Sequence, residues 1–592
     1  MSIQAIDAPA AAVDPITAEV VRSAFVAITD EMKTNLMRTA YNMIIYESLD
    51  YTVGLFDADG NTVSIGLGLP MFIRGLSDAI KAKLAHYGKA GIQPGDILLT
   101  NDSYIMGSHL NHMIFTLPIF WDGELVAFSS SMAHWQDVGG TLRGSTTDIY
   151  EEGLQMPIVK IYRQGQVNDE LVEIIKSNVR FPDLAMGDFR AKVAAIKTGE
   201  RRMLALLARY GRDAVVGSIQ QVFRYSGEVA RRAVRAIPDG IYEAESYMDD
   251  DGVRIGQHVP IRVKVVVAGD QMTIDLTDVS RQVPGYFNSG STAGRSAAQV
   301  AFKCLTTPLL YPINDGSFAP LNIILPPGRV VSAVKPAAVR MWMTIPMTVV
   351  DTIIHAMAPA LPDKVMAGHH ADLMTNTFYG TDPRTGRFFV AAPGNPGGGF
   401  GATCRSDGMC ATVCINDGDT HNRPVESVET RFPMVVEEYS LLPDSGGAGR
   451  YRGGLGARRT VRVRGEMTMN SKIERTACPP WGLFGGLPAA ANKIMLRHAD
   501  ATIERFPNGK IGGLSLAPGE ASIRESGGGG GYGPPWERPA AQVQHDVREG
   551  YVSLQAARDQ YGVVLDPATL ALDAAATARA RDTLRRAAAN AG

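Results

Sequence analysis

Cysteine is scarce in this sequence. The 592 residues include five cysteines, which are too few and too unevenly spaced for the disulfide framework of a small secreted protein. Cys404, Cys410 and Cys414 lack the Cys-x-x-Cys spacing of a zinc site, so we expect no metal there. Low cysteine content of this kind is typical of a protein that works in a reducing cytoplasm.

Excess charge and long apolar runs are missing as well. The 58 Lys and Arg residues nearly balance the 61 Asp and Glu residues, and no basic stripe or tail predicts binding to nucleic acid or to an anionic membrane. The most apolar stretch, 341–361, is interrupted by Asp351, His355 and two prolines, which favours a core segment over a membrane span. The N-terminus has neither a basic nor an apolar leader segment, so we expect a cytoplasmic protein.

Nucleotide-binding motifs are also absent, although glycine is abundant. Three segments are dense in glycine, at 393–402, 444–456 and 527–533. None of them matches the Gly-x-x-x-x-Gly-Lys-Ser/Thr pattern of a phosphate-binding loop, and no dinucleotide fingerprint occurs. Flexible linkers and tight turns with positive φ are both compatible with the second and third of these segments.

What the sequence does contain predicts an α+β fold of several domains, with mixed sheets, β-rich central and C-terminal parts and a helical tail. Asp14-Pro15 opens a helix as N-cap and first helical residue. Apolar residues follow at helical spacing, namely Val21, Phe25, Ile28, Met32 and Leu36. Further helices are predicted over 183–210, 213–236, 296–303 and 345–358, and strands over 50–56, 97–100, 261–267 and 272–277. We expect a disordered N-terminus (1–13), an α/β domain with the functional site (14–240), a central α+β domain (241–390), a glycine-rich β domain (391–540) and a helical tail (541–592).

A histidine-bearing hairpin is the strongest functional signal. Two apolar, β-favouring runs flank Asp122-Gly123, a preferred two-residue turn. If these two residues form the turn, Asn111 lies opposite His134, and His109 lies diagonal to it. If the turn is shifted by one residue, His112 lies opposite His134 instead. Either register brings imidazoles within reach of each other.

Imidazoles that converge with carboxylates are the ligands that a divalent metal ion needs. The alternative is a set of hydrogen-bonded histidines at a strand end. Asp50 and Asp102 add carboxylates at the ends of predicted strands, where catalytic groups often lie. Strand alternation would point His109 and His112 to opposite faces, so both can bind one ion only if Leu110-Asn111 lies in a bend.

Motifs in a fixed order along the chain resemble those of the hydantoinase B/oxoprolinase family, and are similar to those of acetone and acetophenone carboxylase large subunits. The resemblance extends from Asp14 to about Leu565. Its carriers include Glu47-Ser-Leu-Asp50, Pro94-Gly-Asp96, Asn101-Asp102, His109-Leu110, His134-Trp-Gln-Asp-Val-Gly-Gly140, Asn178-Val-Arg180, Gly187-Asp188, Asn314-Asp-Gly316, Asn422-Arg-Pro-Val-Glu426 and the glycine runs after Asp444 and from Gly527.

The resemblance implies one divalent metal ion bound by this chain. The family's metal ligands fall on Asp50, His109 and His134. Its fourth ligand, usually the Asp of a His-x-x-Asp motif, falls on His112. An imidazole in that place favours Zn²⁺ over harder ions, with Mn²⁺ as the alternative. Asp137 is the other candidate for the fourth position.

The resemblance also implies a division of labour. In a hetero-oligomer, an actin-like ATPase subunit would bind ATP and phosphorylate the oxygen of a hydantoin, lactam or cyclic imide, and this subunit would complete the ring opening. Asp137 or Asp102 would orient a ligand histidine or act as a base, and a turn cap is the alternative role for Asp102. Two other functions stay open: a subunit of a biotin-independent, ATP-dependent ketone carboxylase, and a non-catalytic scaffold.

Overall fold

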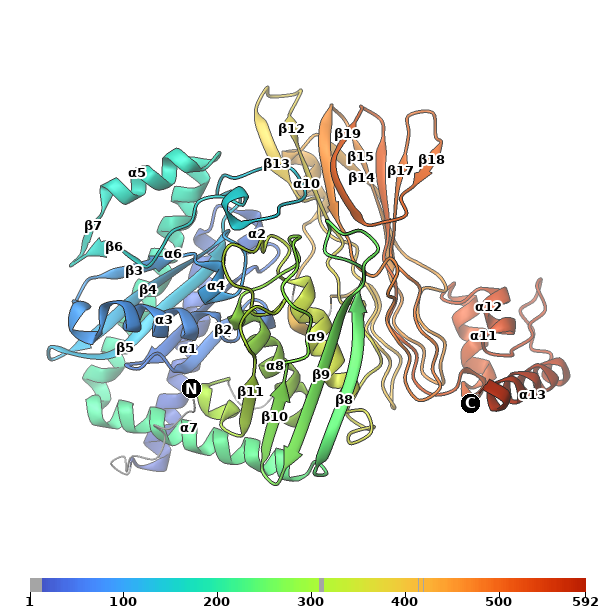
Figure 1. Cartoon of the computed structure of the whole chain (residues 1–592), viewed down its shortest axis with the longest axis horizontal. Coiled ribbons are helices and arrows are strands. Elements are labelled where there is room, and N and C mark those ends of the chain that lie inside the picture. The colour runs from blue at the N-terminus through green and yellow to red at the C-terminus, as the bar shows by residue number, and fades with distance from the viewer. Residues whose placement is uncertain (1–12, 308–312, 414, 419, 592) are drawn as a thin grey trace.

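The described part of the chain, residues 13–307, 313–413, 415–418 and 420–591 of a computed structural model, contains four β-sheets and the helices that cover them. Figure 1 shows their arrangement. This architecture confirms the predicted α+β fold class. Apart from Val13, the segment predicted to be disordered (1–13) lies outside the described residues.

A seven-stranded antiparallel sheet carries the histidine hairpin, in the spatial order β2-β1-β5-β4-β3-β6-β7. Its strands are β1 (Tyr51–Asp57), β2 (Thr62–Leu67), β3 (Ile97–Thr100), β4 (His112–Trp121), β5 (Glu124–His134), β6 (Val159–Arg163) and β7 (Gln166–Val167). The strands predicted at 50–56 and 97–100 are therefore confirmed. Because the neighbours are antiparallel, the starts of β1 and β4 and the end of β5 meet at one end of the sheet.

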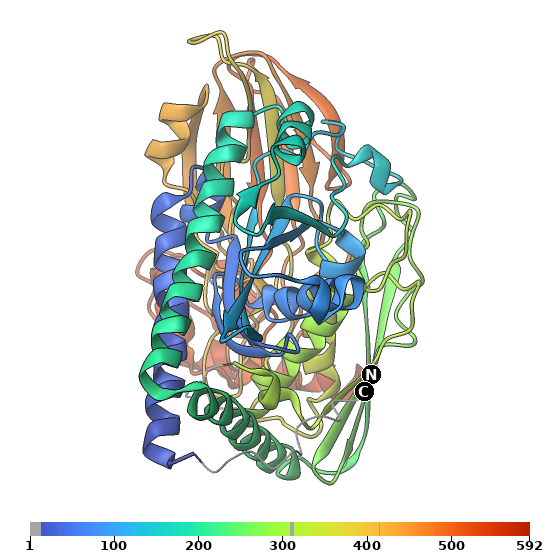
Figure 2. The same ribbon diagram turned by 90° about the vertical axis from the view of Figure 1, so that its left-hand side faces the viewer.

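Long helices pack against this sheet. In α1 (Pro15–Thr39), Asp14 acts as the predicted N-cap, since its carboxylate accepts a hydrogen bond from the Thr17 N–H (2.9 Å), and all five apolar residues of the predicted stripe are buried. Next to α1 runs α6 (Pro182–Tyr210), and α7 (Arg212–Arg235) continues from it in another direction (Figure 2). These three helices share one apolar core with β1. The shorter helices here are α2 (Met43–Tyr46), α3 (Gly75–Tyr87), α4 (Ser103–Met106) and α5 (Asp169–Asn178).

The central part is a four-stranded sheet with two helices against it. The sheet order is β11-β10-β9-β8. The elements are β8 (Gly240–Met248), β9 (Val259–Ala268), β10 (Gln271–Asp275), β11 (Leu321–Ile324), α8 (Ser291–Thr306) and α9 (Thr344–Ala356). Ile261, Phe302 and Ile353 share one apolar core, which joins the sheet to both helices. The helix predicted at 296–303 begins earlier, at Ser291, and the helix predicted at 345–358 is confirmed.

Two further sheets stack in the C-terminal half, with the orders β13-β12-β16-β19 and β14-β15-β20-β17-β18. The elements are β12 (Thr375–Thr381), β13 (Phe388–Ala391), α10 (Val425–Arg431), β14 (Met434–Leu441), β15 (Ala457–Val463), β16 (Met467–Lys472), β17 (Lys493–Arg497), β18 (Ile503–Arg505), β19 (Lys510–Leu516) and β20 (Ala521–Glu525). Phe378 and Met469 of the first sheet share a core with Val461 and Ile494 of the second. The two sheets therefore form a sandwich.

The three glycine-dense segments pack backbone against backbone beside this sandwich. The Gly529 N–H, for example, donates to the Gly454 carbonyl oxygen (3.0 Å). A Cβ atom on Gly453 would lie 1.7 Å from the Gly529 carbonyl oxygen, so no side chain fits there. Among the glycines of these segments, only Gly394 and Gly533 have a positive φ. For the second and third segments the linker interpretation is therefore wrong, and the turn interpretation holds only at Gly533, because most of these glycines allow two backbones to approach closely.

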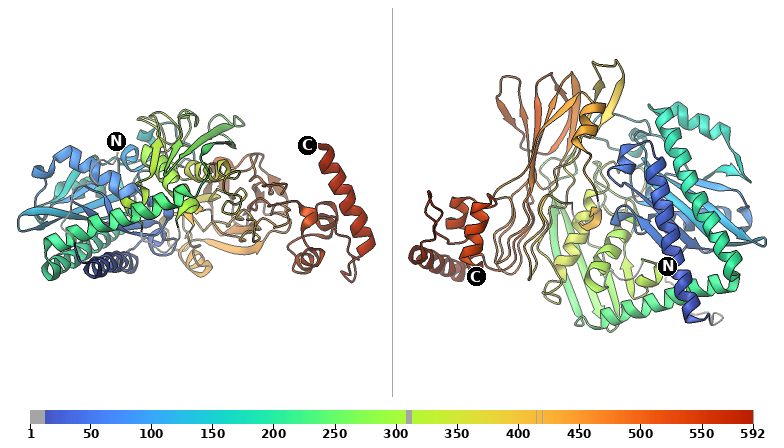
Figure 3. Two further views of the ribbon diagram at one scale, coloured as in Figure 1. Left: turned by 90° about the horizontal axis from the view of Figure 1, so that it is seen from below. Right: turned by 180° about the vertical axis from the view of Figure 1, so that it is seen from behind.

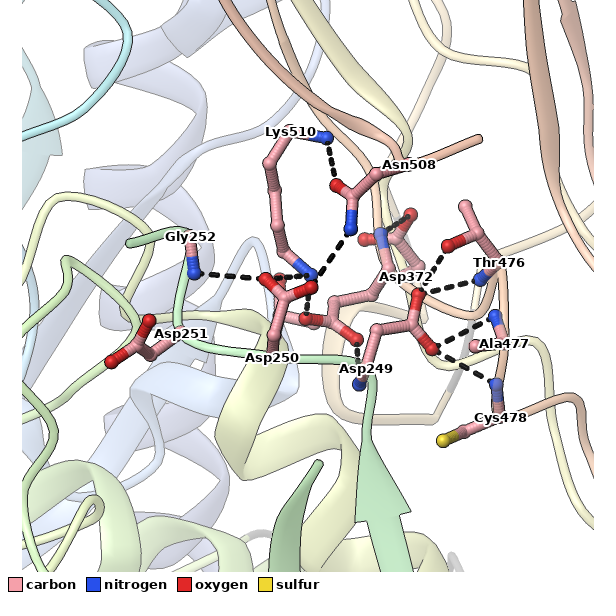
Figure 4. Close-up of polar contacts among 12 residues, drawn as sticks. Asp249, Asp250, Asp251, Gly252, Asp372, Thr476, Ala477, Cys478, Asn508 and Lys510 are labelled. Atoms are coloured by element: carbon pink, nitrogen blue, oxygen red, sulfur yellow. Dashed lines mark hydrogen bonds and ion pairs between the residues drawn. The ribbon is translucent and has the colours of Figure 1, made fainter. Parts of the chain in front are cut away.

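A buried ionic cluster joins the central sheet to the sandwich (Figure 4). Lys510 begins β19, and its Nζ lies 2.5 Å from Glu474 and 3.3 Å from Asp250, which follows β8. All three side chains are 2% exposed or less. The neighbouring Asp249 carboxylate accepts backbone hydrogen bonds from Thr476, Ala477 and Cys478. Charge therefore holds these two sheets together at a place that water does not reach.

The predicted helical tail is present as α11 (Ala540–Arg548), α12 (Leu554–Asp559) and α13 (Ala574–Ala591). It stands at one end of the molecule (Figure 3). Val543, Ala557 and Tyr561 share a small apolar core with Ala448 of the second glycine-dense segment. None of the helices in the described ranges is both long enough and apolar enough to cross a membrane.

Candidate active site

The β4–β5 hairpin combines the predicted turn with the shifted register. Asp122 and Gly123 are the turn residues, and their φ values of 48° and 83° are those that a two-residue hairpin turn requires. A β-bulge then adds one residue, Val126, to β5. This extra residue moves every later pair by one position without moving the turn.

As a result, His112 is paired with His134, and the predicted pairing of Asn111 with His134 does not occur. Asp50 lies next to this pair, because it immediately precedes β1 and its carbonyl oxygen accepts a hydrogen bond from the His134 N–H (3.2 Å). The bulge thus decides which side chains share this end of the sheet.

His109 reaches the same place from a turn. Leu110 and Asn111 form a turn in which the His112 N–H donates to the His109 carbonyl oxygen (3.3 Å). The bend that both histidines need to face one point is therefore present. Their rings stack with centroids 4.9 Å apart and planes 21° apart.

All four predicted ligand side chains meet here. The ring centroids of His109 and His134 are 4.9 Å apart, and those of His112 and His134 are 5.2 Å apart. The Nε2 atom of His112 lies 2.9 Å from Oδ1 of Asp50. The end of the sheet therefore gathers three imidazoles and one carboxylate.

The three imidazoles are neutral. Burial lowers the pKa of His112 to about 3 and holds the pKa values of His109 and His134 well below their usual range. Burial also raises the pKa of Asp50, against the positive charge of Arg423. Neutral imidazole is the form that binds a metal ion.

Each imidazole keeps one nitrogen without a hydrogen-bond partner. Nδ1 of His109 lies 3.2 Å from the Arg340 carbonyl oxygen, and because a carbonyl oxygen can only accept, Nδ1 carries the proton and Nε2 keeps its lone pair. Nε2 of His109 and Nδ1 of His112 and of His134 are buried and unpartnered among the described residues. A buried polar atom without a partner is costly, so three of them at one place indicate a missing ligand.

This donor set fits a divalent ion by its chemistry, since neutral imidazole and carboxylate are both ligands that Zn²⁺ accepts. Nowhere in the described ranges, however, do three His, Cys, Asp or Glu side chains already stand so that they could hold a metal ion. His109 and His112 stack face to face, and Asp50 engages Nε2 of His112. These side chains would have to rotate to direct their free nitrogens at one point.

The four side chains line a cavity of about 590 Å³. Its other walls come from distant parts of the chain, around Trp342, Ala391, Thr412 and Lys472. The volume suits a small organic substrate. The cavity thus lies where the seven-stranded sheet, the central part and the glycine-rich part meet.

The two predicted catalytic carboxylates lie differently. Asp137 lines the cavity, but its carboxylate binds Arg180 through the guanidinium (2.6 Å) and the backbone N–H (2.6 Å). Asp102 does not line the cavity. It is the N-cap of α4, and its Oδ1 accepts the Tyr104 N–H (2.9 Å), which is the alternative role considered above.

Two titratable residues that line the cavity, Asp417 and Arg423, were not among the predicted site residues. Burial, with the nearby charge of Asp50, raises the pKa of Asp417 well above its usual range. Arg423 belongs to the motif Asn422-Arg-Pro-Val-Glu426, so the family resemblance contained a signal for it. Asp417 carries no such signal, because only the tertiary fold brings it to the cavity.

Comparisons with known sequences agree with this architecture. The chain is 32% identical over 572 residues to the beta subunit of caprolactamase from Pseudomonas jessenii, covering 94% of this chain and 97% of the relative. It is 29% identical over 580 residues to the B subunit of a putative D-/L-hydantoinase from Pseudomonas sp. (strain NS671), covering 93% and 95%. An uncharacterized protein of Methanocaldococcus jannaschii is 31% identical over 557 residues, covering 93% and 96%.

Solved structures share the fold over nearly the whole chain. The ATP-dependent caprolactamase of Pseudomonas jessenii superposes with a TM-score of 0.90 at 30% identity, covering 97% of this chain and 100% of that one. Acetone carboxylase in its nucleotide-free form superposes with a TM-score of 0.88, covering 98% and 84%, and at 20% identity this likeness concerns the fold alone. The family model of hydantoinase B/oxoprolinase matches residues 14–535. The chain therefore belongs to the hydantoinase B/oxoprolinase family.

Proposed function

We propose that this chain is the metal-dependent B-type subunit of a cytoplasmic, ATP-dependent amidohydrolase that opens a hydantoin, lactam or cyclic imide. The observation that carries the proposal is the group of three neutral imidazoles with unpartnered nitrogens, beside Asp50, on the wall of a 590 Å³ cavity. The relatives named as caprolactamase and hydantoinase subunits support the substrate class.

The chemistry explains why ATP is needed. Resonance makes a ring amide a poor electrophile. When a partner subunit with an actin-like ATPase fold phosphorylates the amide oxygen, the carbon becomes part of a reactive imidate. Water then adds to that carbon, and the ring C–N bond breaks with its electron pair on nitrogen, which takes up a proton. A second water releases the phosphate from the carboxyl oxygen.

Asp50, His109, His112 and His134 would hold the metal ion, for which this donor set favours Zn²⁺, with Mn²⁺ as the alternative. Such an ion would lower the pKa of a bound water near the substrate. The Arg340 carbonyl oxygen fixes the tautomer of His109 by accepting its Nδ1 proton.

The cavity walls shield the reaction. Phe72 and Trp342 line the cavity, and both lie against the His112 ring, with centroids 5.0 Å and 6.1 Å away. Apolar walls of this kind keep bulk water from an activated phosphate ester. Asp137, held by Arg180, would position the loop that follows β5.

The proposal is tested with the chain purified together with an actin-like ATPase subunit from the same genome. The complex should convert ATP and one of a panel of hydantoins, lactams and cyclic imides to the ring-opened product and phosphate, without added bicarbonate. His109→Ala in the same complex should abolish turnover while the complex still forms.

Other outcomes would assign another function. Consumption of a ketone that depends on bicarbonate would identify a carboxylase and contradict the hydrolase proposal. Full ring-opening activity with His109→Ala and His134→Ala would indicate that this chain is only a scaffold.

A further inference from the structure

Three buried arginines gather beside the cavity without a carboxylate partner. Arg423 lines the cavity, Arg459 lies on β15 and Arg524 lies on β20. Their exposures are 9%, 1% and 0%, and no described residue forms an ion pair with any of them. The Nε atom of each guanidinium is buried without a hydrogen-bond partner. Unpaired buried charge is expensive, so three such groups in one place need a compensating anion.

Arg459 and Arg524 are anchored to backbone. Arg459 donates to the Pro393 carbonyl oxygen (2.7 Å). Arg524 donates to the carbonyl oxygens of Met374 (2.6 Å) and Gly394 (2.7 Å). These contacts neutralise no charge, so both guanidiniums remain a fixed positive background behind the wall of the cavity.

Arg423 is the one of the three that lines the cavity, and its guanidinium makes no hydrogen bond with any described residue. The chain on either side of it is held. Asn422 bonds the backbone of Asn395 in both directions (2.8 and 2.9 Å) and the Tyr439 hydroxyl (3.0 Å), and Pro424 is the N-cap of α10. A rigid segment therefore presents a free guanidinium to the cavity, which lowers the entropic cost of binding a ligand.

The nearby acids do not complete a pair with Arg423. Asp50 and Glu47 act on it only through their charge, without an ion-pair contact. Burial, with the charge of Asp50, raises the pKa of Asp417 well above its usual range, which disfavours its ionised form. Burial and the charge of Arg459 lower the pKa of Arg423 to about 10, against the charge of Asp50, so the guanidinium stays charged at neutral pH.

We propose that Arg423 binds the phosphoryl group of the O-phosphorylated substrate, with Arg459 and Arg524 supplying the positive potential behind it. This inference rests on the proposed function for the identity of the ligand. A dianion suits the site better than a carboxylate, because Arg423 has no ion-pair partner among the described residues and two more guanidiniums lie behind it. The planar guanidinium offers parallel N–H donors to two phosphoryl oxygens. The reacting carbon would then lie towards Asp50 and the histidines.

The test measures anion binding to the purified chain with titration calorimetry, using inorganic phosphate and acetate as probes. The parent should bind phosphate more tightly than acetate. Arg423→Met should weaken phosphate binding by about tenfold or more. Arg423→Lys keeps the positive charge but lacks the parallel N–H donors of the guanidinium, so it should bind phosphate about threefold more weakly than the parent. The matched control is Arg458→Met, which removes a half-exposed arginine of β15 that already pairs with Glu525.

The outcomes separate this inference from the proposed function, because binding needs no turnover. Loss of phosphate binding in Arg423→Met but not in Arg458→Met supports the site even if no lactam is opened. Equal phosphate binding by parent and Arg423→Met, tighter binding of acetate, or no phosphate binding at millimolar concentration would overturn it. If Arg423→Met does not fold, equal phosphate binding by the parent and Arg423→Lys overturns it.

Discussion

Replacing Lys510 by Met should destabilise the junction between the central sheet and the sandwich, and more so at high pH. The substitution keeps the aliphatic stem but removes the charge that faces Asp250 (Figure 4) and that lies 2.5 Å from Glu474. Removing one partner of a buried ionic group costs about 3–5 kcal/mol of unfolding free energy. We expect a loss in this range at pH 8.5.

The pH dependence follows from Glu474. Burial raises the pKa of Glu474 to about 7 from its usual 4.5, so the folded parent loses stability from this group as the pH rises from 4.5 to about 7. Without Lys510 the pKa of Glu474 rises further. The free energy of unfolding of the variant therefore keeps falling above pH 7, by about 1.4 kcal/mol per pH unit, whereas that of the parent no longer falls in this range. The difference in unfolding free energy between the parent and Lys510→Met should therefore grow by roughly 2 kcal/mol between pH 7 and pH 8.5.

The assay is urea denaturation followed by circular dichroism at pH 6 and pH 8.5. The matched control is Lys493→Met on β17, since Lys493 is 56% exposed and lies 3.6 Å from Glu525. A surface pair of this kind contributes about 0–1 kcal/mol. If Lys510→Met lowers the unfolding free energy by the same amount at both pH values, or by no more than the control does, the role given to Lys510 is refuted.

The remaining predictions concern the metal, His112 and the partner. His109→Ala and His134→Ala should each lose most of the bound divalent metal by elemental analysis. The control, His86→Ala on the exposed face of α3, should keep it. Full metal retention in both site variants would contradict the ligand assignment. His112→Leu should weaken metal binding because it removes a donor, and His112→Asp should shift the preference towards Mn²⁺; a Leu variant that binds metal as tightly as the parent would argue against His112 as a ligand. The isolated chain should neither hydrolyse ATP nor open an unactivated lactam, and ATPase activity of the chain alone would contradict the division of labour.

Local features of the sequence determined much of the fold. Asp14 and the apolar spacing that follows predicted α1, because capping and the helical period act within a few residues. Asp122-Gly123 predicted the hairpin turn, because both positions need positive φ. The end of that hairpin could therefore be named as the place where histidines gather, and the resemblance added Asp50.

Other features were decided only by the tertiary structure. One extra residue, Val126, chooses the partner of His134, and a bulge leaves no local pattern strong enough to predict it. Composition alone left turns and linkers open for the glycine-dense segments. It does not reveal that their backbones lie against each other.

The cavity is the clearest case. Arg423 and Asp417 lie far along the chain from Asp50, and no periodicity connects residues at that separation. The charge of Asp50 acts on both of them only because folding buries all three in one low-dielectric space. The sequence by itself therefore determined most of the elements and indicated the histidines at one end of a sheet, whereas the cavity that brings Arg423 to them exists only in the folded chain.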